Sequence, residues 1–137
     1  MEMIKDDCIF CRIANGEIPS RTVYEDDKVR AILDLSPATK GHTLILPKEH
    51  FDNLYEIPEE YLCHIAVVSR KIALLMKERL GTDGLNIIQN NGETAGQTVK
   101  HYHMHCIPRY NGDGQHMLWE PHTLTDEEMD AVLAKLV

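Results

Sequence analysis

The chain of 137 residues combines several short apolar runs with one long stretch in which apolar residues recur every three or four positions. The short runs have the length and the Val, Ile and Leu content of β-strands, whereas the long stretch has the periodicity of an α-helix. Strands are therefore predicted at residues 23–24, 28–35, 42–47, 84–89 and 101–109.

The long stretch is predicted to form a helix from Pro58 to about Arg79. Proline and then acidic residues in the first turn are typical of a helix start, and Gly81 suits the position after its last turn. Apolar residues occupy more than one face of this helix. The residues that widen the main stripe are Val67, Val68, Leu74 and Leu75. A helix with two apolar faces must cover the sheet and a second surface. A partner subunit and a thick monomeric core are the two alternatives, and we expect the partner subunit.

Short helices are predicted over residues 8–14 and after Thr125, where Thr125 and Glu128 have the spacing of a capping box. Residues 111–121 are expected to be irregular, with Trp119 as their only large anchor. The order strand–strand–strand–helix–strand–strand leaves few parallel crossovers. It predicts one α+β domain over residues 1–137, built on an antiparallel five-stranded sheet with one long helix and short terminal helices.

Three histidines, His101, His103 and His105, stand at alternate positions. If this segment is extended, their imidazole rings share one face, while Tyr102, Met104 and Cys106 share the other face and point into the core. Rings arranged in this way can bind a metal, attack phosphorus or transfer protons. Chance is the competing explanation, but eight histidines in the whole chain do not readily produce this alternation.

A polar, glycine-containing loop at residues 90–98 comes directly before the three histidines. Glycine allows backbone N–H groups to approach an anion closely, and Gln97 and Thr98 add side-chain donors. An isolated Gly-Gln-Thr sequence is compatible with an ordinary loop. Its position in front of the histidines favours a phosphate-binding loop.

The net charge of −8 argues against broad binding to the backbone of a nucleic acid, although it permits binding of a single nucleotide. No apolar run approaches the roughly 20 residues that span a bilayer, and the acidic segment 1–7 lacks the apolar region of a signal peptide. A cytoplasmic protein with neither a nucleic-acid nor a membrane partner is expected.

The four cysteines are too few for a disulfide framework. Cys63 and Cys106 lie in apolar stretches and are expected to be buried thiols. Cys8 and Cys11 form a Cys-x2-Cys pair, which is compatible with a redox pair, a coincidental core pair or half of a zinc site.

Several of these segments together resemble the histidine-triad (HIT) family. The matching segments are Cys8–Ile13, Gly16–Ser20, Leu33–Pro37, Gly41–Lys48, Gly96–Thr98 and the alternating histidines. The chain is most similar to the Hint branch, the nucleoside phosphoramidases. The resemblance implies a small homodimeric protein that binds and hydrolyses nucleotides.

The resemblance also implies roles for individual residues. His103, the middle histidine, is the expected nucleophile, and His42 is expected to support the triad from the neighbouring strand. The expected nucleotide-binding residues are Asp34, Leu35, Asn90, Gly96, Gln97, Thr98, His103 and His105. The expected ligands of a structural zinc ion are Cys8, Cys11, His50 and His101.

The expected activity is cleavage of the P–N bond of a purine nucleoside 5′-phosphoramidate, related to AMP or GMP, through a nucleotidyl-His103 intermediate. Hydrolysis of a dinucleoside polyphosphate and non-enzymatic nucleotide binding in an interaction protein are alternatives. Catalysis by zinc-bound water would require an open coordination position, which four protein ligands would fill. The acid that protonates the leaving amine is either His105 or Thr98 acting through water.

Overall fold

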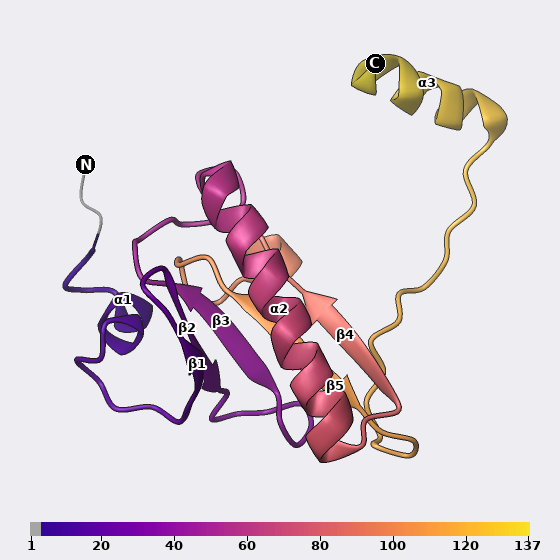
Figure 1. The fold of residues 1–137 in the computed structure, drawn as a ribbon. Coiled ribbons are helices and arrows are strands. Elements are labelled where there is room, and N and C mark those ends of the chain that lie inside the picture. Colours follow the sequence, from indigo (N-terminus) through magenta and orange to yellow (C-terminus); the bar gives the residue numbers. More distant parts are fainter. Residues whose placement is uncertain (1–3) are drawn as a thin grey trace.

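The computed structural model describes residues 4–137 and consists of an antiparallel sheet with a helix on each face (Figure 1). Met1–Met3 of the acidic N-terminal segment lie outside the described residues. The strands are β1 (Thr22–Glu25), β2 (Val29–Leu33), β3 (Thr43–Pro47), β4 (Gly84–Ile88) and β5 (Met104–Arg109), in the sheet order β1-β2-β3-β5-β4. The helices are α1 (Ile9–Ala14), α2 (Glu59–Leu80) and α3 (Asp126–Leu136), with a 3₁₀ turn at Glu93–Ala95. The α+β class and the five-stranded antiparallel sheet are confirmed.

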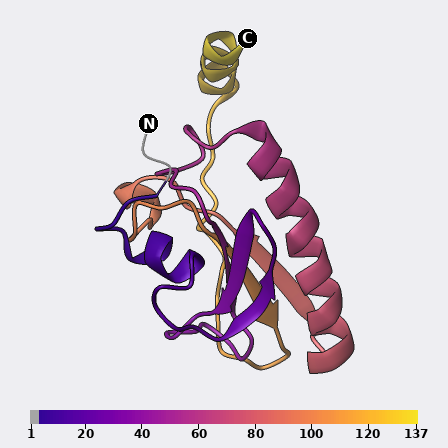
Figure 2. The same ribbon diagram turned by 60° about the vertical axis from the view of Figure 1, so that its left-hand side comes forward.

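Each face of the sheet has its own core, and Figure 2 shows α1 and α2 on opposite sides of the sheet. The buried residues of α2 recur every three or four positions and are Tyr61, Ile65, Val68, Ile72 and Met76. They pack with Tyr102, Met104 and Cys106, as the alternation in the histidine segment predicts. On the other face, Ala14 of α1 packs against Ile32, Leu44 and Leu46. The histidine rings therefore belong to the face that α1 covers.

The strand predicted at residues 101–109 begins only at Met104, so that His101 and His103 precede it. Pairing between β3 and β5 ends at Ile45 and Met104. Two residues further along β3, the carbonyl oxygen of Pro47 accepts a hydrogen bond from the ring of His101 at 2.8 Å. Proline also has no N–H group to donate to a ladder. The other four strands agree with the predicted bounds to within two residues.

The predicted helix ends are confirmed. Gly81 follows α2 in the left-handed conformation, with φ 63°, and Thr125 forms a complete capping box with Glu128 at the start of α3. Cys106 is buried, and its burial raises the pKa of its thiol to about 12. The prediction for Cys63 is wrong, because this thiol is exposed on the outer side of α2.

The segment between β5 and α3 is irregular, as predicted, but Trp119 does not anchor it, because this side chain is 82% exposed. Figure 1 shows α3 standing apart from the sheet at the end of this segment. Among residues 4–137, no helix is both long enough and apolar enough to cross a membrane.

Asp26 closes the turn between β1 and β2. One carboxylate oxygen accepts hydrogen bonds from the backbone N–H groups of Lys28 and Val29 at 2.9 Å, and the other accepts from Tyr24 and His64. His64 thereby joins α2 to this turn at 2.6 Å. Partial burial acts to raise the pKa of Asp26, but the four hydrogen bonds outweigh it and lower this pKa to about 2.

We expect Asp26→Asn to destabilise the fold by about 1–2 kcal/mol, because the bonds to the charged carboxylate are lost. The folded-state pKa is below the unfolded value of 3.8, so the carboxylate stabilises the fold fully above about pH 4. That contribution should be lost as the pH falls towards 2. Urea unfolding of both proteins at pH 7 and pH 3 measures the effect. Asp27→Asn, at the exposed neighbouring position, is the control, and an equal loss in both variants would contradict the assignment.

Candidate functional site

Five histidine rings form a continuous row across the α1 side of the sheet. The ring of Phe10 lies edge-on to both His101 and His103, with centroid distances of 6.0 and 5.0 Å. The remaining neighbours along the row are 5.1 Å apart and are His50–His101, His103–His105 and His105–His42. The row therefore joins a cysteine-containing cluster at one end to Asp34 at the other.

His103 is held so that one ring nitrogen remains free. Its side chain is 6% exposed, and Nδ1 lies 2.7 Å from the carbonyl oxygen of His101. A carbonyl oxygen only accepts hydrogen bonds, so Nδ1 carries the proton and Nε2 carries the lone pair. Burial lowers the pKa of His103 and thereby favours the neutral ring. A neutral imidazole with a free Nε2 lone pair is a nucleophile.

His105 is held in the opposite tautomer. The backbone N–H of Ala38 donates to Nδ1 of His42 at 2.9 Å, which leaves the proton of a neutral His42 on Nε2. That nitrogen lies 2.9 Å from Nδ1 of His105 and donates to it, so the proton of His105 is on Nε2. Burial, followed by the proximity of His103 and His42, lowers the pKa of His105 to about 4. His105 therefore offers an N–H donor beside the lone pair of His103.

The same hydrogen bonds determine what the cluster of Asp34, His42 and His105 can bind. Its possible ligand atoms lie within 4.8 Å of one another, as a metal site would require. However, the Ala38 amide places a proton on Nε2 of His42, the nitrogen that faces the cluster. A protonated ring nitrogen has no lone pair for a metal ion. His42 and His105 therefore form a hydrogen-bonded pair, and the carboxylate of Asp34 lies beside it.

The loop at residues 90–98, before the histidines, is held mainly by contacts between its own residues. Gly96 has φ 95°, a conformation that L side chains rarely adopt, and the amide of Asn90 lies against it. The amide of Gln97 donates to the carbonyl oxygens of Asp52 at 2.6 Å and Val99 at 3.0 Å, and its oxygen accepts from the N–H of Gly92.

The backbone N–H groups of Gly96 and Gln97 also donate to carbonyl oxygens within the loop. Within residues 4–137, the exposed Thr98 forms no hydrogen bond through its hydroxyl group. The hydroxyl group of Thr98 is therefore available to a ligand, whereas Gln97 shapes the loop.

Asp34 and Leu35 lie at the far end of the row of rings. One oxygen of Asp34 accepts from the N–H of Ser36 at 2.8 Å, and the other lies 3.6 Å from Nε2 of His42. The side chain of Asp34 is 21% exposed, so it is accessible to a ligand hydroxyl group. Leu35 is 86% exposed, and a base that contacts it would be covered on one side only within a single chain.

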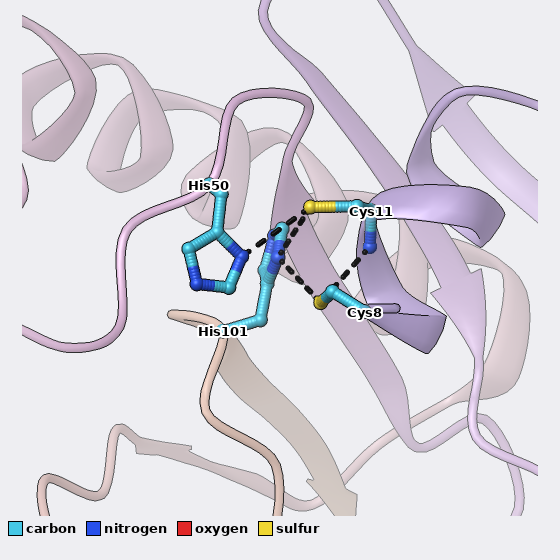
Figure 3. Close-up of side chains that lie close together, drawn as sticks. All are labelled: Cys8, Cys11, His50 and His101. Carbon is cyan, nitrogen blue, oxygen red and sulfur yellow. Dashed lines mark hydrogen bonds between the residues drawn. The ribbon is translucent and has the colours of Figure 1, made fainter. Parts of the chain in front are cut away.

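Four side chains from three separate segments converge at the other end of the row (Figure 3). Nδ1 of His101 lies 3.4 Å from the sulfur atoms of both Cys8 and Cys11, and Nδ1 of His50 lies 3.3 Å from the sulfur of Cys11. Tetrahedral zinc with bonds of about 2.0–2.3 Å requires ligand separations of roughly 3.3–3.8 Å. The donor set and its spacing therefore fit a zinc ion.

Both histidines of this cluster are oriented for metal binding by their other nitrogen. Nε2 of His101 donates to the carbonyl oxygen of Pro47, and Nε2 of His50 lies 2.6 Å from the carboxylate of Asp52. Each neutral ring then presents its Nδ1 lone pair to the cysteines, as metal-ligating histidines commonly do. Burial lowers the pKa of His101 to about 4 and raises that of Cys11 to about 11.

Three contributions to the site were not predicted from the sequence. Phe10 packs between His101 and His103, and its position between the two cysteines was the only signal for it. Asp52 orients His50 from two residues away, a spacing that is visible in the sequence. The Ala38 amide sets the tautomers of His42 and His105, and a backbone group leaves no signal in the sequence.

A small α+β domain in which a row of histidine rings follows a glycine-containing loop defines the histidine-triad class of protein. The chain belongs to the HIT domain family, whose model matches residues 15–112. Members of this family are generally nucleotide hydrolases.

Three relatives illustrate the similarity. The chain is 52% identical over 108 residues to a HIT-like protein of Methanocaldococcus jannaschii, which covers 79% of this chain and 83% of the relative. It is 50% identical over 118 residues to Protein hit of Bacillus subtilis, covering 85% and 81% of the two chains. It is 39% identical over 124 residues to the adenylylsulfatase HINT3 of Arabidopsis thaliana, covering 88% of this chain and 60% of the relative.

Solved structures of similar proteins have the same fold. A HIT family member from Bacillus subtilis matches with a TM-score of 0.88 and 44% identity, covering 96% of this chain and 95% of the other. A zinc-bound histidine triad family protein from Mycobacterium smegmatis matches with a TM-score of 0.77 and 41% identity, covering 95% of each chain. A hypothetical histidine triad nucleotide-binding protein from Sulfolobus tokodaii matches with a TM-score of 0.74 and 39% identity, covering 94% of this chain and 88% of the other.

Proposed function

We propose that this protein hydrolyses purine nucleoside 5′-phosphoramidates through a covalent intermediate on His103. The observation that carries this proposal is the pair of opposite tautomers. The carbonyl oxygen of His101 leaves a lone pair on Nε2 of His103, and the Ala38–His42 relay leaves a proton on Nε2 of His105. Adjacent rings therefore supply the nucleophile and an N–H donor for the nitrogen that leaves when a P–N bond is cleaved.

In the first step, Nε2 of His103 attacks the α-phosphorus, a P–Nε2 bond forms and the P–N bond to the leaving amine breaks. The leaving nitrogen accepts a hydrogen bond from Nε2–H of His105 and takes its proton from a water molecule, because an unprotonated amide ion is a poor leaving group and a neutral imidazole does not give up its own proton. In the second step, water attacks the phosphorus, its proton neutralises the hydroxide formed in the first step, and the P–Nε2 bond breaks to release the nucleoside monophosphate. The bond from Nδ1–H of His103 to the carbonyl of His101 stabilises the charged ring of the intermediate.

The remaining residues of the site bind the nucleotide in this proposal. The carboxylate of Asp34 accepts the ribose hydroxyl groups, and Leu35 contacts one side of the base. Thr98 and the amide of Asn90 donate to the phosphoryl oxygens next to Gly96, and Gln97 holds the loop in its conformation. Few polar groups surround the base, so only modest discrimination between AMP and GMP derivatives is expected.

Cys8, Cys11, His50 and His101 would hold zinc with four protein ligands, which closes the coordination sphere. Zinc bound in this way would stabilise the fold and join α1 to the histidine segment. Hydrolysis in this proposal is carried out by His103 and His105.

A second candidate reaction differs only in the leaving group. The similarity to an adenylylsulfatase supports cleavage of adenosine 5′-phosphosulfate, in which sulfate departs without needing a proton. Turnover of adenosine phosphoramidate, guanosine phosphoramidate, adenosine 5′-phosphosulfate and diadenosine polyphosphates, compared in one assay series, tests both. We expect the highest kcat/KM for a phosphoramidate. A higher value for the sulfate or for a polyphosphate would reassign the substrate, and no turnover of any would support a nucleotide-binding interaction protein.

We also expect the protein to be a homodimer. The outer side of α2 carries Val67 and Leu74, each 56% exposed, and the edge strand β4 leaves Leu85 and Ile87 partly exposed. Both surfaces would be covered by a partner, and pairing would also satisfy the open edge. Light scattering at micromolar concentration should give twice the 15.7 kDa mass of one chain. A mass near that of one chain would contradict this expectation.

A further inference from the structure

The C-terminal helix α3 has an apolar stripe that is exposed to solvent in the single chain. Every residue of α3 is exposed, including the apolar residues Met129, Val132, Leu133 and Leu136, which are between 50% and 79% exposed. Their spacing of three and four positions places all of them on one face. An isolated helix of 11 residues is only marginally stable in water, so this helix needs a surface to pack against.

In the single chain, α3 does not reach any surface of residues 4–137 that could cover its apolar stripe. Figures 1 and 2 both show α3 standing away from the sheet and from α2, at the end of the irregular segment that follows β5. A connecting segment of this kind allows a terminal helix to reach a second molecule, as in the exchange of an element between protomers.

The outer side of α2 is the matching surface. Opposite the buried face of α2 runs a stripe formed by Cys63, Val67, Arg70, Leu74 and Lys77, which we call the outer stripe. Val67 and Leu74 are each 56% exposed and the Cys63 thiol is exposed, so the stripe presents apolar groups at successive turns.

The two helices carry opposite charges. The first turns of α3 contain Asp126, Glu127, Glu128 and Asp130, and its one basic residue is Lys135. On the outer side of α2 and in its last turn lie Arg70, Lys77 and Arg79, and none of these three forms an ion pair with any of residues 4–137. Acidic residues that flank the apolar stripe of α3 would thus face unpaired basic residues that flank the apolar groups of α2.

We propose that α3 of one molecule docks on the outer stripe of α2 in a second copy of this chain, and that the second copy returns the same contact. A single chain carries both complementary surfaces, so a twofold pair satisfies them all and closes the assembly. Reciprocal exchange also doubles the buried area, which contributes to the roughly 800 Å² per partner that a stable interface needs. The proposal is independent of the reaction that the site catalyses.

Single substitutions on the two surfaces test the contact. Leu133→Glu on the α3 stripe and Leu74→Glu on the outer stripe should each raise the dimer dissociation constant at least tenfold, or about 1.4 kcal/mol. Ala131→Glu adds the same charge to the opposite side of α3 and should leave the constant unchanged. The double variant should be no weaker than the more severe single variant, because both remove one contact. Sedimentation velocity from nanomolar to micromolar concentration measures the wild type and all four variants.

A charge exchange distinguishes docking between chains from folding back within one chain. One variant carries Asp126→Lys and Asp130→Lys, and the other carries Arg70→Glu and Lys77→Glu. Each variant should dimerise poorly alone. A mixture should form heterodimers, because α3 of each molecule then meets an α2 of opposite charge. Native mass spectrometry resolves the species, and an unchanged circular dichroism spectrum shows that the exposed substitutions leave the fold intact. A monomeric wild type, equal constants for Leu133→Glu and Ala131→Glu, or no heterodimer in the mixture would each overturn the proposal.

Discussion

Replacing His103 with alanine is expected to reduce the hydrolysis of adenosine phosphoramidate by several orders of magnitude while AMP binding is largely retained. The reason is a division of roles along the row of rings. Asp34, Asn90 and Thr98 are proposed to hold ribose and phosphate, whereas the buried ring of His103 presents the free Nε2 lone pair. Single-turnover rates with equilibrium binding of AMP separate the two effects. Retention of more than about a tenth of wild-type turnover, a loss of only about 1.4 kcal/mol, would exclude the covalent mechanism.

The matched variant His105→Ala should be less severe, and its effect should depend on the leaving group. A leaving amine needs the hydrogen bond from Nε2–H of His105, which stabilises the charge that develops on its nitrogen, whereas sulfate departs as a stable anion. We therefore expect His105→Ala to slow the phosphoramidate more than adenosine 5′-phosphosulfate, and His103→Ala to slow both substrates alike. Equal losses for both substrates in His105→Ala would assign the ring to phosphate binding alone.

The second large effect concerns metal. Purified protein should contain one zinc ion per chain, and Cys11→Ala should lose this ion together with several kcal/mol of stability. Cys11 is fully buried, and its sulfur lies within 3.4 Å of ring nitrogens of both His50 and His101. Without the metal, α1 would lose its principal link to the histidine segment. Elemental analysis and thermal unfolding, with and without a chelator, measure both changes.

Cys63→Ala is the control for this experiment, because the Cys63 thiol is exposed and distant in the fold from the cluster. It should keep the full zinc content, and a chelator should lower its unfolding temperature by as much as that of the wild type. Protein expressed in zinc-rich medium that still lacks metal would exclude the assigned ligand set.

Much of the fold was determined by local sequence patterns. The spacing of apolar residues predicted α2, and Gly81 and the Thr125–Glu128 pair marked helix ends that the structure confirms. These features depend on neighbours within a few residues, where backbone geometry alone sets which side chains meet. The alternation of Tyr102, Met104 and Cys106 likewise predicted which side of the segment packs in the core.

Other features depended on groups distant in the chain. Cys63 is exposed because it lies opposite the buried face of α2, although its sequence neighbours are apolar. His101 and His103 precede β5 because the carbonyl oxygen of Pro47 accepts a hydrogen bond from the ring of His101, and not from a backbone N–H group of a continued strand. The sequence of the histidine segment does not show this contact, because Pro47 belongs to the neighbouring strand β3.

The candidate site likewise combines features that follow from local sequence with features that depend on groups distant in the chain. The alternation of three histidines after a glycine-containing loop and the spacing of the two cysteines can be seen in the amino-acid sequence. Which nitrogen of each ring carries the proton depends on contacts that form in the folded protein. The deciding groups are the Ala38 amide and the carbonyl oxygens of His101 and Pro47. Every residue except proline has the same backbone N–H and C=O groups, so their use as donors and acceptors is set by packing and is not encoded in any side-chain pattern.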